Sequence, residues 1–135
     1  MPQVDLKFSN NINLDVSLIF KSIELIINDL DASAGACKSR AYPAPNFQHT
    51  HALISIGLLR KSYRDEKFMQ DLLDRLKIEL SNFIPEECYY AIDLSFLGNI
   101  QLKGVEIKDH HQDTLIFVEN LNTSLLNAKK VLNNE

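Results

Sequence analysis

The chain has 135 residues, of which 45% are hydrophobic and 24% are charged. This is the composition of one soluble folded domain and argues against a disordered chain. A net charge of −4 with scattered Lys and Arg argues against a nucleic-acid partner. No apolar run reaches membrane-spanning length and the first residues lack the basic start and apolar centre of a signal peptide, so we expect a cytoplasmic protein without membrane contact.

The first nine residues predict a strand with a special beginning. Apolar and polar side chains alternate with a period of two, as expected when one face is buried: Val4, Leu6 and Phe8 alternate with Gln3, Asp5 and Lys7. Pro2 suits the first position of a strand because it has no amide hydrogen to donate. After removal of Met1, Pro2 would be a secondary amine fixed by the sheet, which is a positioned general base. Met-Pro beginnings are common, however, and the dipeptide alone favours an ordinary N-terminus.

Two amphipathic helices follow from apolar residues at spacings of three and four. The first covers residues 16–30 and ends before Gly35, and the second runs to about residue 83, where Pro85 follows. The apolar positions are Val16, Ile19, Phe20, Ile23, Ile26, Ile27 and Leu30 in the first helix, and Phe68, Leu72, Leu73, Leu76 and Leu80 in the second.

Three further strands are predicted. Residues 37–42 form a short strand before an irregular loop at 43–46, where two prolines stand. Residues 50–58 form a strand whose mixed pattern suggests burial on both faces, and residues 89–96 form the last one.

The order strand, helix, strand occurs twice and predicts an α+β fold. Two β-α-β units should form a four-stranded sheet with both helices on one face. We expect a single domain, 1–135, with a core at 1–97 and a C-terminal extension at 98–135. In that extension we expect a short strand at 102–107 and a third helix whose apolar residues lie between Leu115 and Leu132, although 114–118 also suits a strand.

Few side chains suggest chemistry by themselves. Arg40 has the planar fork that binds a carboxylate through two hydrogen bonds, but an arginine in a surface ion pair is the commoner case. His49 and His51 share one side of a strand but lack a third ligand nearby, so we expect no metal site. Cys37 and Cys88 lack the C-x-x-C spacing and are expected to be free thiols.

Several short segments, in this order, resemble the 5-carboxymethyl-2-hydroxymuconate isomerase branch of the tautomerase superfamily. They are Met1-Pro2, the strand end with Phe8, Ser9 and Asn11, the segment Lys38-Ser39-Arg40-Ala41-Tyr42, and residues His51 to Arg60. The resemblance covers roughly residues 1–97. Its most specific part is Ser39-Arg40-Ala41 at this distance from the proline, and the chain departs from the family after Leu102.

The resemblance implies a small homotrimer of β-α-β units that uses neither a metal nor an organic cofactor. In this family the N-terminal proline takes a proton from one carbon of a substrate and returns it to another. Carried over, Pro2 is the acid/base and Arg40 binds a substrate carboxylate. Further substrate contacts are expected from Arg60, Tyr42 and His51, although Arg60 also suits a solvated turn, Tyr42 a core position and His51 a packing role.

The expected function is therefore an isomerase that acts on a small unsaturated 2-hydroxy or 2-oxo diacid. The alternative is a catalytically inactive trimeric binding protein with the same fold. Two features motivate the alternative: the divergent C-terminal third, and Met1, because a retained methionine would make the Pro2 nitrogen an amide without a basic lone pair.

Overall fold

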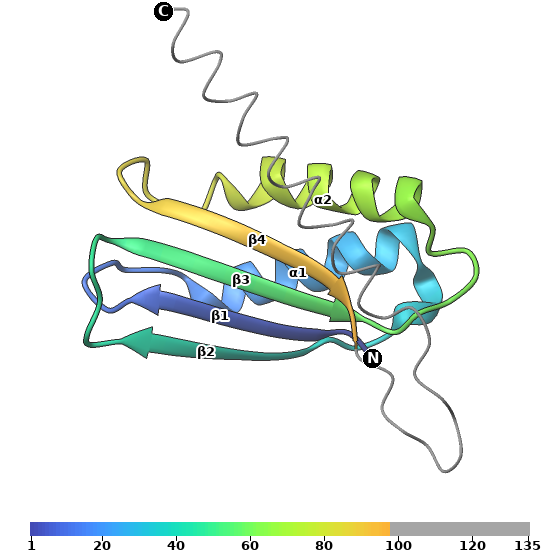
Figure 1. Ribbon diagram of the computed structural model, residues 1–135, viewed down its shortest axis with the longest axis horizontal. Coiled ribbons are helices and arrows are strands. Elements are labelled where there is room, and N and C mark those ends of the chain that lie inside the picture. Colours follow the sequence, from blue (N-terminus) through green and yellow to red (C-terminus); the bar gives the residue numbers. More distant parts are fainter. Residues whose placement is uncertain (98–135) are drawn as a thin grey trace, which may run out of the picture. The chain divides into compact units, whose positions relative to one another are not determined.

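The computed structural model describes residues 1–97 and confirms the predicted order of strands and helices (Figure 1). The elements are β1 (Gln3–Ser9), α1 (Val16–Leu30), the 3-10 helix η1 (Ala32–Ala34), β2 (Lys38–Ala44), β3 (His51–Leu58), α2 (Glu66–Leu80) and β4 (Tyr89–Phe96). The expected strand at 102–107 and the expected third helix lie outside the described residues. Met1–Leu94 form one compact unit, and the single-domain prediction for 1–135 stays a prediction.

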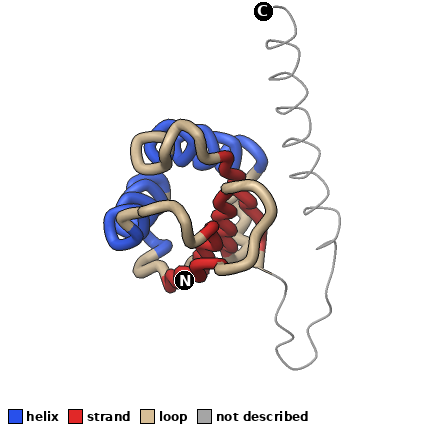
Figure 2. The backbone as a smooth tube through the Cα atoms, turned by 90° about the vertical axis from the view of Figure 1, so that its left-hand side faces the viewer, coloured by secondary structure: helices blue, strands red, loops and turns tan. Residues whose placement is uncertain are grey.

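The four strands form a mixed sheet in the order β2-β1-β3-β4. β1 pairs in parallel with β2 and antiparallel with β3, and β4 runs in the same direction as β3 (Figure 1). Two β-α-β units therefore meet at the antiparallel pair in the centre of the sheet. Both helices cover the same face (Figure 2), so the predicted α+β architecture is confirmed.

The core lies between that face and the helices. Val4 and Leu6 of β1 are 0% exposed, and the apolar stripes of both helices are buried against the strands. The opposite face is only partly covered within the described residues. In β3 each of Leu53, Ser55 and Gly57 is half-buried and alternates with a buried residue. The expectation that β3 is buried on both faces is therefore wrong for this part of the chain, because both helices pack on one side.

The irregular loop predicted at 43–46 begins later than expected, because β2 continues through Pro43 to Ala44. The N–H of Lys38 donates to the carbonyl of Pro2, and the carbonyl of Ala44 accepts from Asn10. Even-numbered residues of β2 therefore direct their backbone groups at β1, and Pro43 directs its nitrogen outward. β2 is an edge strand among residues 1–97, and none of the strands described there requires the missing N–H of Pro43.

An aspartate side chain begins each helix. Asp15 accepts from the N–H of Leu18 at 3.1 Å, and Asp65 accepts from the N–H of Phe68 at 2.8 Å. Each bond satisfies a backbone donor that has no partner within its helix. Among residues 1–97, neither helix is long and apolar enough to cross a membrane.

A buried ion pair joins the end of α1 to the loop before α2. Arg64 donates from Nη2 and Nε to Asp31 Oδ2 at 2.7 and 3.1 Å, and from Nη1 to the carbonyl of Leu59 at 2.7 Å. The side chains are 3% and 7% exposed. Tyr63 and Ser33 add hydrogen bonds to the same carboxylate. Burial alone would raise the pKa of Asp31, but hydrogen bonds from Ser33, Arg64 and Tyr63 hold it well below its usual range.

We predict that Arg64→Met lowers the free energy of unfolding by about 3–5 kcal/mol, because it leaves the buried Asp31 carboxylate without its partner. The matched control is Arg75→Met. Arg75 pairs with Asp29 between the helices, but both side chains are largely exposed, at 42% and 68%, so the expected loss is below about 1 kcal/mol. Urea unfolding measures both values, and equal losses would contradict the structural role of the buried pair.

Candidate active site

Two neighbouring strands, β1 and β2, hold Pro2 in place. It is buried and directly precedes β1, which is a central strand. Its carbonyl accepts a hydrogen bond from the N–H of Lys38 at 2.9 Å. The position of Pro2 therefore depends on where β2 begins.

Two side chains of α1 hold the segment that leads into β2. Asn28 bonds to Gly35 twice, with Nδ2 donating to its carbonyl at 2.8 Å and Oδ1 accepting from its N–H at 3.1 Å. Glu24 Oε2 accepts from the N–H of Cys37 at 2.8 Å. Gly35 has φ +72°, a backbone conformation that side chains disfavour. Sequence reasoning noted Gly35 only as a helix end and missed Glu24 and Asn28.

Arg40 lies on the sheet face opposite the helices, where it forms an ion pair and a hydrogen bond with residues of β1. Its Nε is 2.6 Å from Asp5 Oδ1, and its Nη1 donates to Gln3 Oε1 at 3.0 Å. Arg40 pairs with Asp5, three positions after Pro2, which is about 10 Å along the strand. An incoming carboxylate must compete with Asp5 for this guanidinium.

The other expected site residues divide between the two ends of the sheet. Arg60 follows β3 two residues after Leu58, and Gly57 pairs with Gln3, so Arg60 lies at the Pro2 end.

Tyr42 and His51 are placed differently. Tyr42 pairs with Lys7, about 16 Å along β1 from Pro2, and the Lys7 Nζ is 6.0 Å from the centre of its ring. The backbone of His51 bonds to the Ser9 hydroxyl at the far end of β1, about 23 Å from Pro2. Arg60 therefore lies at the Pro2 end of the sheet, Arg40 lies about 10 Å along it on the face opposite the helices, and His51 lies at the other end.

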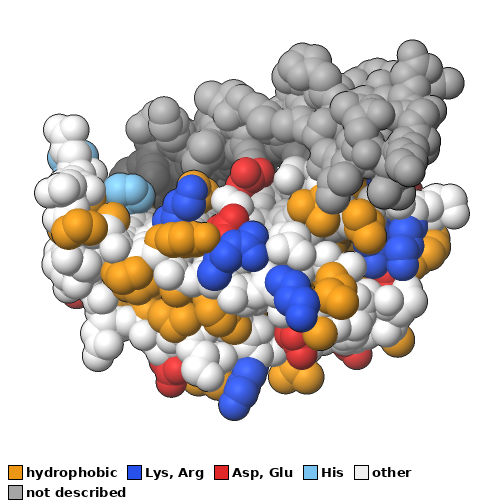
Figure 3. All heavy atoms as spheres, turned by 90° about the horizontal axis from the view of Figure 1, so that it is seen from below, with side chains coloured by type: hydrophobic (Ala, Val, Ile, Leu, Met, Phe, Trp, Pro, Cys, Tyr) orange, Lys and Arg blue, Asp and Glu red, His pale blue; other side chains and the backbone are white. Residues whose placement is uncertain are grey.

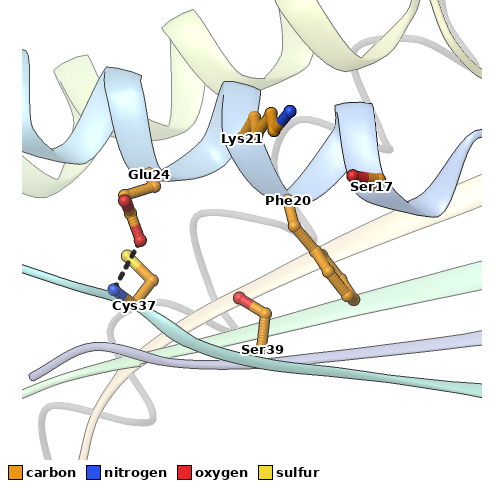
Figure 4. A pocket seen from close by; sticks show the side chains of 6 residues that line it. All are labelled: Ser17, Phe20, Lys21, Glu24, Cys37 and Ser39. Atoms are coloured by element: carbon orange, nitrogen blue, oxygen red, sulfur yellow. Dashed lines mark hydrogen bonds between the residues drawn. The ribbon is translucent and has the colours of Figure 1, made fainter.

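A cavity of about 260 Å³ lies beside this region, between α1 and β2 (Figure 4). Its lining residues are Ser17, Phe20, Lys21, Glu24, Cys37 and Ser39. Burial and the negative charge of Glu24 raise the pKa of the Cys37 thiol to about 11, while the positive N-terminus acts in the opposite direction. The thiol is therefore protonated at neutral pH.

On the face seen in Figure 3, the charged side chains are spread out instead of forming a single patch. Figure 3 shows Lys and Arg side chains distributed among hydrophobic and acidic ones on the face in view. Within residues 1–97, no group of three or more His, Cys, Asp or Glu side chains is placed to hold a metal ion.

Comparisons with known proteins give matches at the level of structure alone. No family model and no curated protein sequence matches the chain. A solved 5-carboxymethyl-2-hydroxymuconate delta-isomerase superposes with a TM-score of 0.57 at 14% identity, covering 83% of this chain and 91% of that protein.

A 5-carboxymethyl-2-hydroxymuconate isomerase from Deinococcus radiodurans R1 gives a TM-score of 0.57 at 13% identity, covering 82% of this chain and 92% of its own. A probable enzyme from the thermophilic fungus Aspergillus fumigatus gives 0.51 at 14% identity, covering 89% and 94%. The chain has the tautomerase fold. The resemblance found in the sequence is thus confirmed for the fold, which is what identities this low can show.

For this tautomerase-fold chain we predict that Cys37 reacts slowly with iodoacetamide at pH 8. A pKa of about 11 instead of 9.0 leaves a thiolate fraction roughly one hundredth of that of an ordinary cysteine. Labelling should rise steeply with pH towards 11.

Glu24→Gln should accelerate labelling at pH 8, because it removes the negative charge and keeps an oxygen that can accept from the Cys37 N–H. The control is Asp29→Asn on the same helix, where the carboxylate is exposed and pairs with Arg75. Peptide mass spectrometry measures the rates. Equal rates in the Glu24 variant and the unchanged protein would show that Glu24 does not set the reactivity of the thiol.

Proposed function

We propose that the chain is an isomerase that moves a proton on a small unsaturated 2-hydroxy or 2-oxo acid, with Pro2 as the acid/base after removal of Met1. The observation that carries this proposal is the placement of Pro2. It is buried at the start of a central strand, and a 2.9 Å bond from Lys38 to its carbonyl holds it. A base fixed in this way avoids the entropy cost that a mobile terminus pays at each turnover. The tautomerase fold supports the same proposal.

In the proposed reaction the Pro2 amine first accepts a proton and then returns it to the substrate. The Pro2 nitrogen accepts a proton from the dienol or from a carbon next to the carbonyl, the electron pair moves through the conjugated system, and the ammonium returns the proton to another carbon. Arg40 binds a substrate carboxylate and stabilises the negative charge of the dienolate. Arg60 supplies a second positive charge at the same end of the sheet, which favours a diacid such as 5-carboxymethyl-2-hydroxymuconate.

We further propose that the chain assembles as a homotrimer through the sheet face opposite the helices. That face carries half-buried residues of β3, among them Leu53, and the charged residues Asp5 and Arg40. A face that mixes apolar and charged groups at partial exposure is suited to contacts between subunits.

One observation favours the alternative, a binding protein that keeps the fold without the chemistry. Arg40 already forms an ion pair with Asp5 and a hydrogen bond with Gln3. In that role Arg40 stabilises the pairing of β1 and β2 and has no substrate to bind. The two experiments below separate the proposals.

We predict that ketonisation of phenylenolpyruvate requires a free Pro2 amine. Protein shown by intact mass to begin at Pro2 is compared with a form that carries extra residues before Pro2. Because the blocked form has an amide in place of the base, it should lose about 10²–10⁴-fold in rate. Equal activity in both forms would exclude Pro2 as the base, and the absence of activity in both would favour the binding protein.

We predict opposite effects at the two members of the Arg40–Asp5 pair. Arg40→Ala should raise the KM for an enol acid about 10- to 150-fold, since the loss of one charge-assisted contact costs about 1.5–3 kcal/mol. Asp5→Asn should lower the KM, because it frees the guanidinium.

The control is Lys38→Ala, which removes a positive charge two residues before Arg40 on the same exposed face and keeps the backbone bond to Pro2. It should change KM little. If Asp5→Asn raises KM as much as Arg40→Ala does, the pair is structural and Arg40 does not bind the substrate.

A further inference from the structure

The cavity between α1 and β2 is built by two elements that face each other. In Figure 4 the Phe20 ring points from the helix towards the strand, and the Ser39 hydroxyl points from the strand towards the helix. Ser39 Oγ makes no hydrogen bond within residues 1–97, so the cavity has one aromatic wall and one polar group without a partner.

This cavity does not belong to the arginine side of the sheet. Successive side chains of a strand point to opposite faces. Cys37 and Ser39 therefore point towards α1, whereas Arg40 points to the other face, where it contacts Asp5 and Gln3. A molecule in the cavity therefore cannot use Arg40 to hold a carboxylate.

Ser17, Glu24 and Ser39 can each accept a hydrogen bond in the cavity, whereas Lys21 can only donate one. Glu24 uses Oε2 to accept from Cys37 and keeps Oε1 for another donor. The hydroxyls of Ser17 and Ser39 can also accept. Lys21 also lines the cavity, but its side chain points away from Ser39, whereas Glu24 points towards Cys37 (Figure 4). Glu24 acts on Cys37 more strongly than the positive N-terminus does, so the side of the cavity next to β2 carries a net negative charge.

We propose that this cavity binds a small aromatic molecule that carries a hydrogen-bond donor and no negative charge, such as a phenol or an arylalkyl amine. The ring packs against Phe20 at the distance and offset that aromatic pairs favour, and the donor bonds to Glu24 Oε1 and Ser39 Oγ. A volume of about 260 Å³ lies near the lower limit of ligand pockets, which are roughly 300–1,000 Å³. The ligand is therefore a single ring with a short substituent.

The test is a titration of the full chain, followed by two-dimensional NMR of its backbone amides. The probes are phenol, benzylamine and benzoate. Phenol and benzylamine should shift the amides of Cys37 and Ser39 with dissociation constants on the order of millimolar, as expected for ligands of this size. Benzoate should bind at least several-fold more weakly, because its carboxylate faces Glu24. Both bound probes should also slow alkylation of Cys37.

Three variants locate the site. Phe20→Ala should raise the dissociation constants of phenol and benzylamine at least fivefold. Ser39→Ala should have the same effect without disturbing the core. Glu24→Gln should weaken benzylamine more than phenol, because only the amine loses an ion pair. The control is Leu25→Ala, which truncates a 72% exposed side chain on the outer surface of α1 and should leave binding unchanged.

Three results would overturn the proposal: amide shifts that do not saturate, equal binding of benzoate and phenol, or equal effects of Phe20→Ala, Ser39→Ala and the Leu25 control. None of these measurements uses the Pro2 reaction. The cavity proposal and the isomerase proposal can therefore fail independently.

Discussion

The buried pair of Asp31 and Arg64 is the contact on which the Pro2 end of the molecule depends. Asp31 ends α1, and Arg64 belongs to the loop that leads from β3 into α2. This contact joins the first β-α-β unit to the second inside the protein core. Arg60 lies in the same loop, so the buried Asp31–Arg64 pair helps to position the exposed side chain of Arg60. Removing two charges from water is costly, and the five hydrogen bonds to the Asp31 carboxylate offset that cost.

A second set of contacts runs from α1 through β2 to the N-terminus. Asn28 and Glu24 hold the backbone at Gly35 and Cys37, and Lys38 then bonds to Pro2. Each of these hydrogen bonds involves a backbone group, so none of them depends on which side chain occupies position 2. The fold therefore holds the backbone of position 2 in a defined place through backbone contacts.

The strands and helices could be predicted from the sequence because their patterns are local. Alternation in β1 and spacings of three and four in the helices depend only on neighbouring residues, and the sheet follows from the repeated strand-helix-strand order. The site depends on register, which local patterns do not contain. The antiparallel pairing of β1 with β3 sends His51 to the far end of the sheet, although it stands close to Arg60 in the resemblance. The bonds of Glu24 to Cys37, of Asn28 to Gly35 and of Arg64 to Asp31 could not be predicted either, because these partners lie 7 to 33 residues apart and are brought together by tertiary packing.

Pro43 in β2 limits the binding of a further strand to this edge of the sheet. β2 is an edge strand, and its odd-numbered residues direct their backbone groups outward. Pro43 has no N–H to offer there, so the outward N–H donors of the strand belong to Ser39 and Ala41. Charged side chains at Lys38 and Arg40 flank these positions. A foreign strand that docks on this edge gains few hydrogen bonds, which is how natural sheets avoid aggregation through their open edges.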